Sequence, residues 1–449
     1  MKTQLKLKMW LIALFIAAPI VTTGAVIESN KQAMLDVAVS NPYLQADKIQ
    51  KAYLRVALTG FVTNTAGSAR TPVNVAIVID KSGSMTGEKI EKAKNAAIMA
   101  LNRLNSNDII SVVTYDSTVS VIVPATKVSD KTEIEQMIQS IQAGNNTALF
   151  GGVSKGAQEV RKFLGLERVN RIILLSDGLA NVGPSSPDEL GCLGASLAKE
   201  GISVTTIGIG LGYNEDLMTK LAFKSDGSHY FAENASDLAG VFNSEFGQVL
   251  GVVAQDVRID IECPSGIRPV RFLGRTGRIS DSTASVSISN LYAGHEKFAM
   301  LEVEVLPGAN GSSRKLAAVK TSYLNMKTHV IDKLATSLGI SFTDSPDLVE
   351  KRADSRVMVD VVKLLAAEKN DLVIALRDKG QIDEARKAGT ENSLYLKSNA
   401  VQLNSPALSD ELQKQEMFNK GLEQDADYNR SRKVMREQQY QVQTQQQKN

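Results

Sequence analysis

Between residues 74 and 250, short apolar runs alternate with amphipathic segments. Two of the runs, 172–175 and 204–209, are almost continuously apolar or β-branched, as in strands that are buried on both faces of a parallel sheet. The alternation therefore predicts an α/β domain. We expect strands at 74–79, 109–115, 119–123, 171–176, 203–209 and 229–232. We expect helices at 88–104, 130–142, 149–164, 187–200, 214–223 and 235–250.

The connections between these strands predict how the sheet is built. The link between the strand ending at 115 and the strand beginning at 119 is too short for a crossover helix. The strands 109–115 and 119–123 should therefore form a hairpin, with 119–123 as an antiparallel edge strand. The other strands are separated by predicted helices. The sequence predicts a doubly wound, mostly parallel six-stranded sheet with a Rossmann-like architecture.

The pattern changes after about residue 251, where apolar and polar residues alternate in short runs that are separated by Gly, Pro and Ser. Such runs, of which 257–262 and 298–305 are examples, predict a small β-sandwich over 251–344. Residues 52–62 have the same pattern, although they precede the α/β domain. We expect this early strand to join the sandwich, which would place the α/β domain in or beside it.

From residue 345 the apolar residues have helical spacing. Residues 371–397 resemble one tetratricopeptide-like helical hairpin, with no second copy. The last residues are charged and rich in Gln, which favours disorder. We divide the chain into a signal peptide (1–25), an N-terminal arm with one strand of the sandwich (26–71), the α/β domain (72–250), the sandwich (251–344), a helical region (345–437) and a disordered tail (438–449).

The N-terminus has the pattern of an export signal. Basic residues up to Lys8 precede the apolar run 9–18, and the small residues 23–25 offer a cleavage site. The alternative is a retained membrane anchor, but the run is shorter than the roughly 20 residues that span a bilayer, and Pro19 interrupts it. We expect an exported protein, periplasmic or extracellular, with no stable membrane span after cleavage.

Composition narrows the classes of partner and cofactor. The 51 basic and 49 acidic residues nearly balance. Removal of residues 1–25 takes away three Lys, which leaves 48 basic residues (51 − 3) and a formal charge of −1. No basic patch stands out, so nucleic acid is a poor candidate partner. Three His and two Cys argue against a zinc site or a disulfide scaffold. Whether Cys192 and Cys263 pair stays open, because the sequence does not give their distance.

Oxygen-bearing side chains gather where the predicted strands end. Asp80, Ser82 and Ser84 follow the apolar run 73–79, Thr147 precedes a predicted helix, and Asp177 follows another strand. In open α/β sheets, ligands bind at the carboxyl ends of the strands. Carboxylate and hydroxyl oxygens suit a hard divalent cation. The five residues therefore predict a metal site at this edge.

These five residues, in this order, resemble the metal-ion-dependent adhesion site of the von Willebrand factor type A domain, in which Asp-x-Ser-x-Ser is followed by a Thr and an Asp. The resemblance covers about residues 72–250. It implies that Ser82, Ser84 and Thr147 bind the metal directly and that Asp80 and Asp177 act mostly through water. It also implies an open position for a partner's carboxylate. Mg²⁺ or Mn²⁺ fits best, with Ca²⁺ as the alternative.

Two further features qualify the resemblance. Asn145-Asn146 stands where many relatives have two glycines, so the surface that faces a partner should differ. The wider layout resembles bacterial secreted or periplasmic proteins related to inter-alpha-trypsin inhibitor heavy chains and calcium-activated chloride channel regulators. The turn at 291–296 carries that second, looser match, which does not imply channel activity.

We interpret the chain as a metal-dependent protein-binding module for adhesion or assembly, and not as an enzyme. One alternative is a structural scaffold of a cell-envelope assembly whose metal only stabilises the loops. Another is a hydrolase with Ser82 or Ser84 as nucleophile. A hydrolase needs a base, and the sequence places none of its three His beside Asp80. No Gly-x-Ser-x-Gly elbow directly follows a predicted strand. The absence of a phosphate-binding loop argues against a nucleotide-driven motor.

Overall fold

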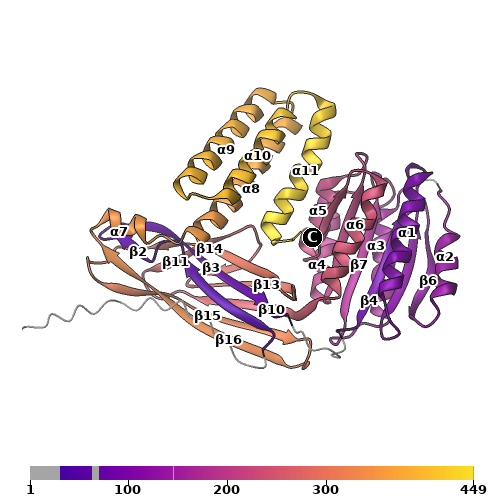
Figure 1. Cartoon of the computed structure of the whole chain (residues 1–449), viewed down its shortest axis with the longest axis horizontal. Helices are drawn as coiled ribbons and strands as arrows, with labels where there is room; N and C mark the ends of the chain where they lie inside the picture. Colours follow the sequence, from indigo (N-terminus) through magenta and orange to yellow (C-terminus); the bar gives the residue numbers. More distant parts are fainter. Residues whose placement is uncertain (1–30, 63–69, 145, 448–449) are drawn as a thin grey trace, which may run out of the picture.

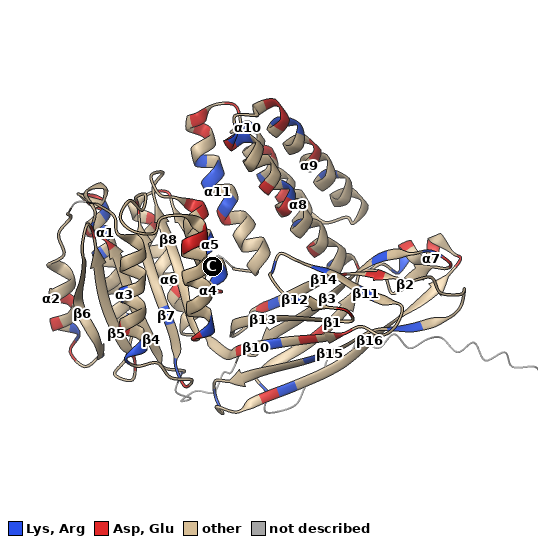
Figure 2. Ribbon diagram, turned by 180° about the vertical axis from the view of Figure 1, so that it is seen from behind, with Lys and Arg blue, Asp and Glu red and all other residues tan. Residues whose placement is uncertain are grey.

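The computed structural model describes residues 31–62, 70–144 and 146–447. The predicted signal peptide (1–25) and Asn145 lie outside these residues. The described chain forms an α/β domain, a pair of packed β-sheets and a group of C-terminal helices that lies against both (Figure 1). Acidic and basic residues are interspersed over all three parts (Figure 2).

The α/β domain contains a six-stranded sheet in the order β6-β5-β4-β7-β8-β9. All neighbouring strands are parallel except β5 and β6, which form the predicted hairpin. The doubly wound, mostly parallel sheet predicted from the sequence is therefore confirmed. The strands are β4 (Val73–Asp80), β5 (Ile109–Tyr115), β6 (Val119–Lys127), β7 (Val169–Ser176), β8 (Ile202–Ile209) and β9 (His229–Ala232).

Helices cover both faces of this sheet. Successive strand residues point to opposite faces, so Ile77 packs in one core and Val78 in the other. Helices α1, α2 and α6 close the first core, and α3, α4 and α5 close the second. The helices are α1 (Glu88–Arg103), α2 (Lys131–Gln139), α3 (Leu149–Arg161), α4 (Pro187–Lys199), α5 (Glu215–Lys224) and α6 (Leu238–Val249), with short 3-10 turns η1 (Gly83–Met85) and η2 (Ala235–Asp237).

Two further sheets share a third core, and their strands precede and follow the α/β domain in the sequence. Their strands pair antiparallel except for β16 and β2, which are parallel. The α/β domain is thus inserted between β3 and β10. One sheet has the order β1-β3-β14-β11, with β1 (Ala33–Val39), β3 (Gln50–Gly60), β14 (Glu296–Val305) and β11 (Ile267–Leu273). The other has the order β12-β13-β10-β15-β16-β2, with β12 (Arg278–Ser280), β13 (Thr283–Tyr292), β10 (Val252–Glu262), β15 (Ser313–Asn325), β16 (Ile331–Thr343) and β2 (Tyr43–Gln45).

The N-terminal arm is more ordered than the sequence indicated. We predicted one strand within residues 26–71, but β1 and β2 also lie there. The prediction missed β1 because its apolar residues do not alternate. Leu35 and Val37 face the core between the sheets, whereas Ala38 faces helix α8 (Ser355–Asp378) on the outside. A strand that is covered on both faces loses the period of two.

The C-terminal region is helical, as predicted, but it extends further. Its helices are α7 (Pro346–Lys351), α8 (Ser355–Asp378), α9 (Ile382–Gln402), α10 (Pro406–Lys420) and α11 (Asp425–Thr444). The prediction of a disordered tail from Gln438 is wrong for residues 438–444. Tyr440 is 3% exposed, and its hydroxyl donates to the Gly227 carbonyl at 2.9 Å. Polar contacts with the α/β domain order this segment.

Cys192 is exposed and Cys263 is buried, and neither forms a disulfide. Burial raises the pKa of the Cys263 thiol to about 11. Within the described residues, no helix combines the length and the apolar character needed to cross a membrane.

Candidate metal centre

Asp80 ends strand β4 and is fully buried. One carboxylate oxygen, Oδ1, accepts the backbone N–H of Ser82 at 2.8 Å, and the other, Oδ2, accepts the hydroxyl of Ser176 at 2.6 Å. Burial raises the pKa of Asp80, while these hydrogen bonds oppose the rise. The charge of Asp177 raises the pKa of Asp80 further, so a cation between the two carboxylates would favour the ionised form.

Asp177 follows strand β7 and lies beside the loop that carries Ser82 and Ser84. Its Oδ1 accepts the hydroxyl of Ser84 at 2.7 Å, and the hydroxyls of Ser82 and Ser84 lie 3.1 Å apart. Its Oδ2 is paired with the ammonium of Lys89, in the first turn of α1. The side chain of Asp177 is completely buried. A buried carboxylate is costly unless it is paired, so the Lys89 ammonium stabilises the charge of Asp177.

Thr147 is held in the loop before α3. Its backbone N–H donates to the Asn181 side chain at 2.8 Å, and its carbonyl accepts the Asn181 backbone N–H at 3.1 Å. The Thr147 side chain faces the same place as the two serines. A Cβ added to Gly178 would lie 3.3 Å from the Ser84 hydroxyl, 3.4 Å from the Thr147 hydroxyl and 3.9 Å from the Ser82 hydroxyl. The fold therefore brings three hydroxyl oxygens around a space that Gly178 leaves free.

The residues present fit a hard divalent cation. All five side chains predicted from the sequence meet at the carboxyl edge of the sheet, and all their donor atoms are oxygens. Across the parts of the chain that the structure describes, no group of three or more His, Cys, Asp or Glu could hold a metal. Of the five side chains, two are carboxylates and three are hydroxyls, a set of oxygen ligands that suits Mg²⁺, Mn²⁺ or Ca²⁺.

The sequence analysis missed several residues that support this edge. Ser176 anchors Asp80, and Lys89 balances Asp177. Asp116 accepts the Lys81 ammonium at 2.5 Å, and its carbonyl accepts the backbone N–H of Ala148. Burial opposes ionisation of Asp116, but the hydrogen bonds from Lys81 and Thr118 and the charge of Lys81 together outweigh it and lower the pKa of Asp116 to about 2. The Ser-Asp-Gly sequence at a strand end was the one local signal for Ser176.

The family model for the von Willebrand factor type A domain matches residues 74–244. The chain contains a von Willebrand factor type A domain. The predicted resemblance is thereby confirmed. Type A domains are typically metal-dependent modules for protein interaction.

The chain is similar in sequence to curated proteins over part of its length and similar in fold to solved structures over most of its length. The uncharacterised protein YfbK of Escherichia coli K12 is 30% identical over 204 residues, which are 45% of this chain and 36% of that protein. Human inter-alpha-trypsin inhibitor heavy chain H3 is 27% identical over 35% of this chain and 18% of that protein. The chain thus spans well under two thirds of the length of these curated relatives. A von Willebrand factor type A structure from Catenulispora acidiphila superposes with a TM-score of 0.70 at 17% identity, over 87% of this chain and 91% of that one.

Proposed function

We propose that the type A domain binds a protein partner through a divalent cation held by Asp80, Ser82, Ser84, Thr147 and Asp177. The observation that carries this proposal is the convergence of three hydroxyls beside Gly178. The hydroxyls would bind the ion directly, and the two carboxylates would act mostly through water. Mg²⁺ or Mn²⁺ is the preferred ion, and Ca²⁺ is the alternative. When bound, the ion supplies a positive centre that can accept a carboxylate.

The charges around the site favour an acidic partner. A divalent ion and the Lys89 ammonium together carry three positive charges, against two negative charges on Asp80 and Asp177. Lys81 and Asp116 compensate each other. The occupied site would therefore keep a net charge of +1, which an incoming Asp or Glu side chain would neutralise.

Apolar side chains are exposed at the same edge. Leu179, two residues after Asp177, is 60% exposed. Leu211, in the loop between β8 and α5, is 41% exposed. Both would border a partner that reaches the ion. We propose that the recognised segment combines an acidic side chain with apolar neighbours.

We propose binding rather than catalysis. His229 is a buried residue of β9 whose Nδ1 lies 2.9 Å from the hydroxyl of Thr206. His295 packs against Tyr292 in the sandwich, and His329 lies in the turn between β15 and β16. These positions do not favour a hydrolase built on Ser82 or Ser84. We further propose, from the N-terminal sequence, that the protein is exported.

Thermal unfolding of the full chain tests the metal site. A ligand that binds only the folded state stabilises it by roughly 2.7 kcal/mol when its free concentration is about 100 times Kd. We expect Mg²⁺ or Mn²⁺ to raise the Tm measured by circular dichroism, relative to EDTA. Thr147→Val keeps the shape of the side chain but removes one hydroxyl, so it should abolish the rise.

Thr86→Val is the matched control. Its hydroxyl lies on the same edge but donates to the Gly83 carbonyl, so this variant should keep the rise in Tm. An equal rise in wild type and Thr147→Val would contradict the assigned ligands. The metal could raise the Tm although the chain captures no acidic protein segment in a metal-dependent way. That result would favour the structural-scaffold alternative.

A further inference from the structure

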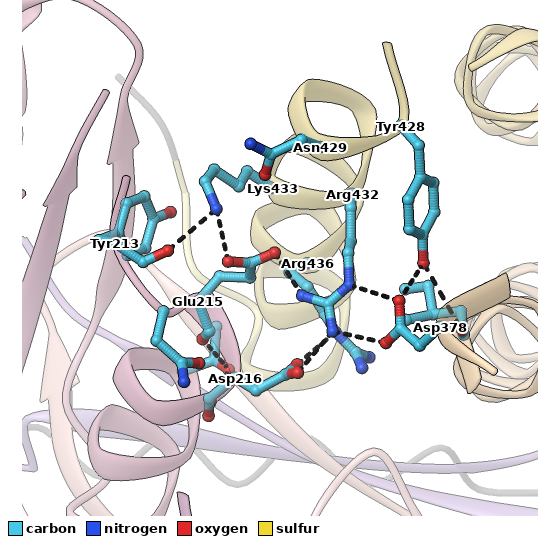
Figure 3. Close-up of polar contacts among 12 residues, drawn as sticks. Tyr213, Glu215, Asp216, Asp378, Tyr428, Asn429, Arg432, Lys433 and Arg436 are labelled. Carbon is cyan, nitrogen blue, oxygen red and sulfur yellow. Dashed lines mark hydrogen bonds and ion pairs between the residues drawn. The ribbon is translucent and has the colours of Figure 1, made fainter. Parts of the chain in front are cut away.

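Helix α11 docks on the type A domain mainly through charged side chains (Figure 3). Arg432 pairs with Glu215, with Asp216 at 2.6 Å and with Asp378 of α8 at 2.8 Å. Arg436 pairs with Asp216 at 2.9 Å and with Asp371 of α8 at 2.6 Å. Helix α11 therefore joins α5 of the type A domain to α8 of the C-terminal region.

One contact of α11 goes beyond this pairing of charges. The Lys433 side chain is buried, and its ammonium donates to Glu215 at 2.6 Å and to the backbone carbonyl of Tyr213 at 3.0 Å. The side chain of Asn429, one turn earlier, donates to the Leu211 carbonyl at 3.3 Å. Both carbonyls belong to residues 210–214, the loop between β8 and α5. Helix α11 thus holds the backbone of this loop from one side.

The other side of the loop lies against the candidate metal centre. A Cβ added to Gly212 would lie 2.8 Å from the carbonyl oxygen of Asp177. A Cβ added to Gly210 would lie 3.9 Å from the ammonium of Lys89, the partner of the Asp177 carboxylate. Residues 210–214 therefore lie between α11 and the segment that carries Asp177.

We propose that helix α11 positions the metal centre: Lys433 and Asn429 hold residues 210–214 against Asp177, so that loss of these contacts loosens the Asp177 segment and weakens cation binding. The consequence for the cation rests on the proposed function, whereas the contact between α11 and the Asp177 segment does not. Lys433 is a positioning residue, because it acts through the loop. If Lys433 served only to compensate the charge of Glu215, loss of its hydrogen bond to the Tyr213 carbonyl would not change cation binding.

A pair of variants in the full chain separates positioning from charge compensation. Lys433→Met breaks the contact with the Tyr213 carbonyl. It also removes one cationic partner of the Glu215 carboxylate, which is buried. Adding Glu215→Gln removes that buried charge, so the double variant should recover stability. If Lys433 positions the loop, the double variant should still bind Mn²⁺ about fivefold or more weakly than wild type, as measured by electron paramagnetic resonance of free Mn²⁺.

Arg430→Met is the control on the same helix. Arg430 forms an exposed ion pair with Glu233, outside residues 210–214. This variant should bind Mn²⁺ as wild type does.

Gly212→Ala tests the other side of the loop. The added Cβ would press on the Asp177 carbonyl, and the Gly212 backbone is not left-handed, so alanine is not excluded by its φ angle. It should weaken Mn²⁺ binding, whereas Gly240→Ala, where a Cβ meets open space, should not.

Hydrogen exchange provides a readout that needs no metal. In EDTA, the double variant should lose amide protection at residues 177–182 relative to wild type, and Arg430→Met should not. Wild-type protection and wild-type Mn²⁺ affinity in the double variant would overturn the proposal. A wild-type chain that binds no Mn²⁺ would overturn the proposed function instead, and the exchange measurement would still decide whether α11 holds the Asp177 segment.

Discussion

The type A sheet and helix α11 are held in place by different kinds of contact. Strands β4 and β7 are buried at every position, and most of their own side chains are aliphatic. The buried residues of α11 are largely polar or charged, including Lys433, Glu437 and Gln439. Apolar burial is non-directional and involves no charged groups, whereas hydrogen bonds depend on geometry and ion pairs depend on charge and are screened by salt. The sheet therefore forms a robust frame, and α11 forms a specific but more easily disturbed contact on its edge.

The largest effect should come from a cavity in the sheet. Ile173 is fully buried in the centre of β7. Ile173→Ala should lower the free energy of unfolding by about 2–5 kcal/mol, because it removes apolar burial and leaves a cavity. Denaturant unfolding measures this change. Val401→Ala, at a site that is 77% exposed on α9, is the control and should change stability by less than about 0.5 kcal/mol. Equal effects at the two sites would contradict the assigned core.

A pH effect should come from a buried lysine beside the contact between domains. Lys297 is 5% exposed, and Asp226, Arg275, Arg171 and Glu245 face it. Burial outweighs the attraction of Asp226 and lowers the pKa of Lys297 from 10.5 to about 8. Between these values the unfolded chain binds more protons than the folded one, so this group makes stability rise with pH, by about 3 kcal/mol from pH 8 to pH 10.5.

The contribution of Lys297 is measured as a difference. Buried tyrosines such as Tyr292, whose pKa burial raises, make stability fall above about pH 10. Wild type and Lys297→Met share this background, so the gap between their unfolding free energies should shift in favour of wild type as the pH rises from 8. A constant gap would show that Lys297 does not titrate in this range.

The smallest effect should be local to the edge of the sheet. The side-chain amide of Gln446 accepts the backbone N–H of His229 at 3.0 Å and donates to its carbonyl at 2.9 Å, as a neighbouring strand would. Gln446→Leu should lower the local opening free energy of β9 by about 1–2 kcal/mol. Hydrogen exchange at His229 measures it. Protection at Ile173, in the centre of the sheet, should stay as in wild type, and a loss there would mean that the edge and the core open together.

The same contrast explains what the sequence could predict. The strands around Ile173 and Thr206 were predictable because their apolar runs reflect burial on both faces. The meeting of Asp80, Ser82, Ser84, Thr147 and Asp177 at one edge was predictable, because they lie at strand ends or in the loop before a helix and occur in a fixed order. Helix α11 beyond Gln438 was not, because its Gln and Tyr side chains find partners only in the folded domain. Ser176 and Lys89 were missed for the same reason, since their roles depend on tertiary contacts with Asp80 and Asp177.

The insertion of the type A domain between β3 and β10 has a mechanical consequence. Strand β4 begins and helix α6 ends at the end of the domain that faces the sandwich, and the proposed binding edge lies at the opposite end (Figure 1). A partner that pulls on the binding edge would load the parallel strands β4 and β7 along their length. Their hydrogen bonds would then be sheared together instead of being unzipped one by one, so the domain is suited to transmit tension into the sandwich.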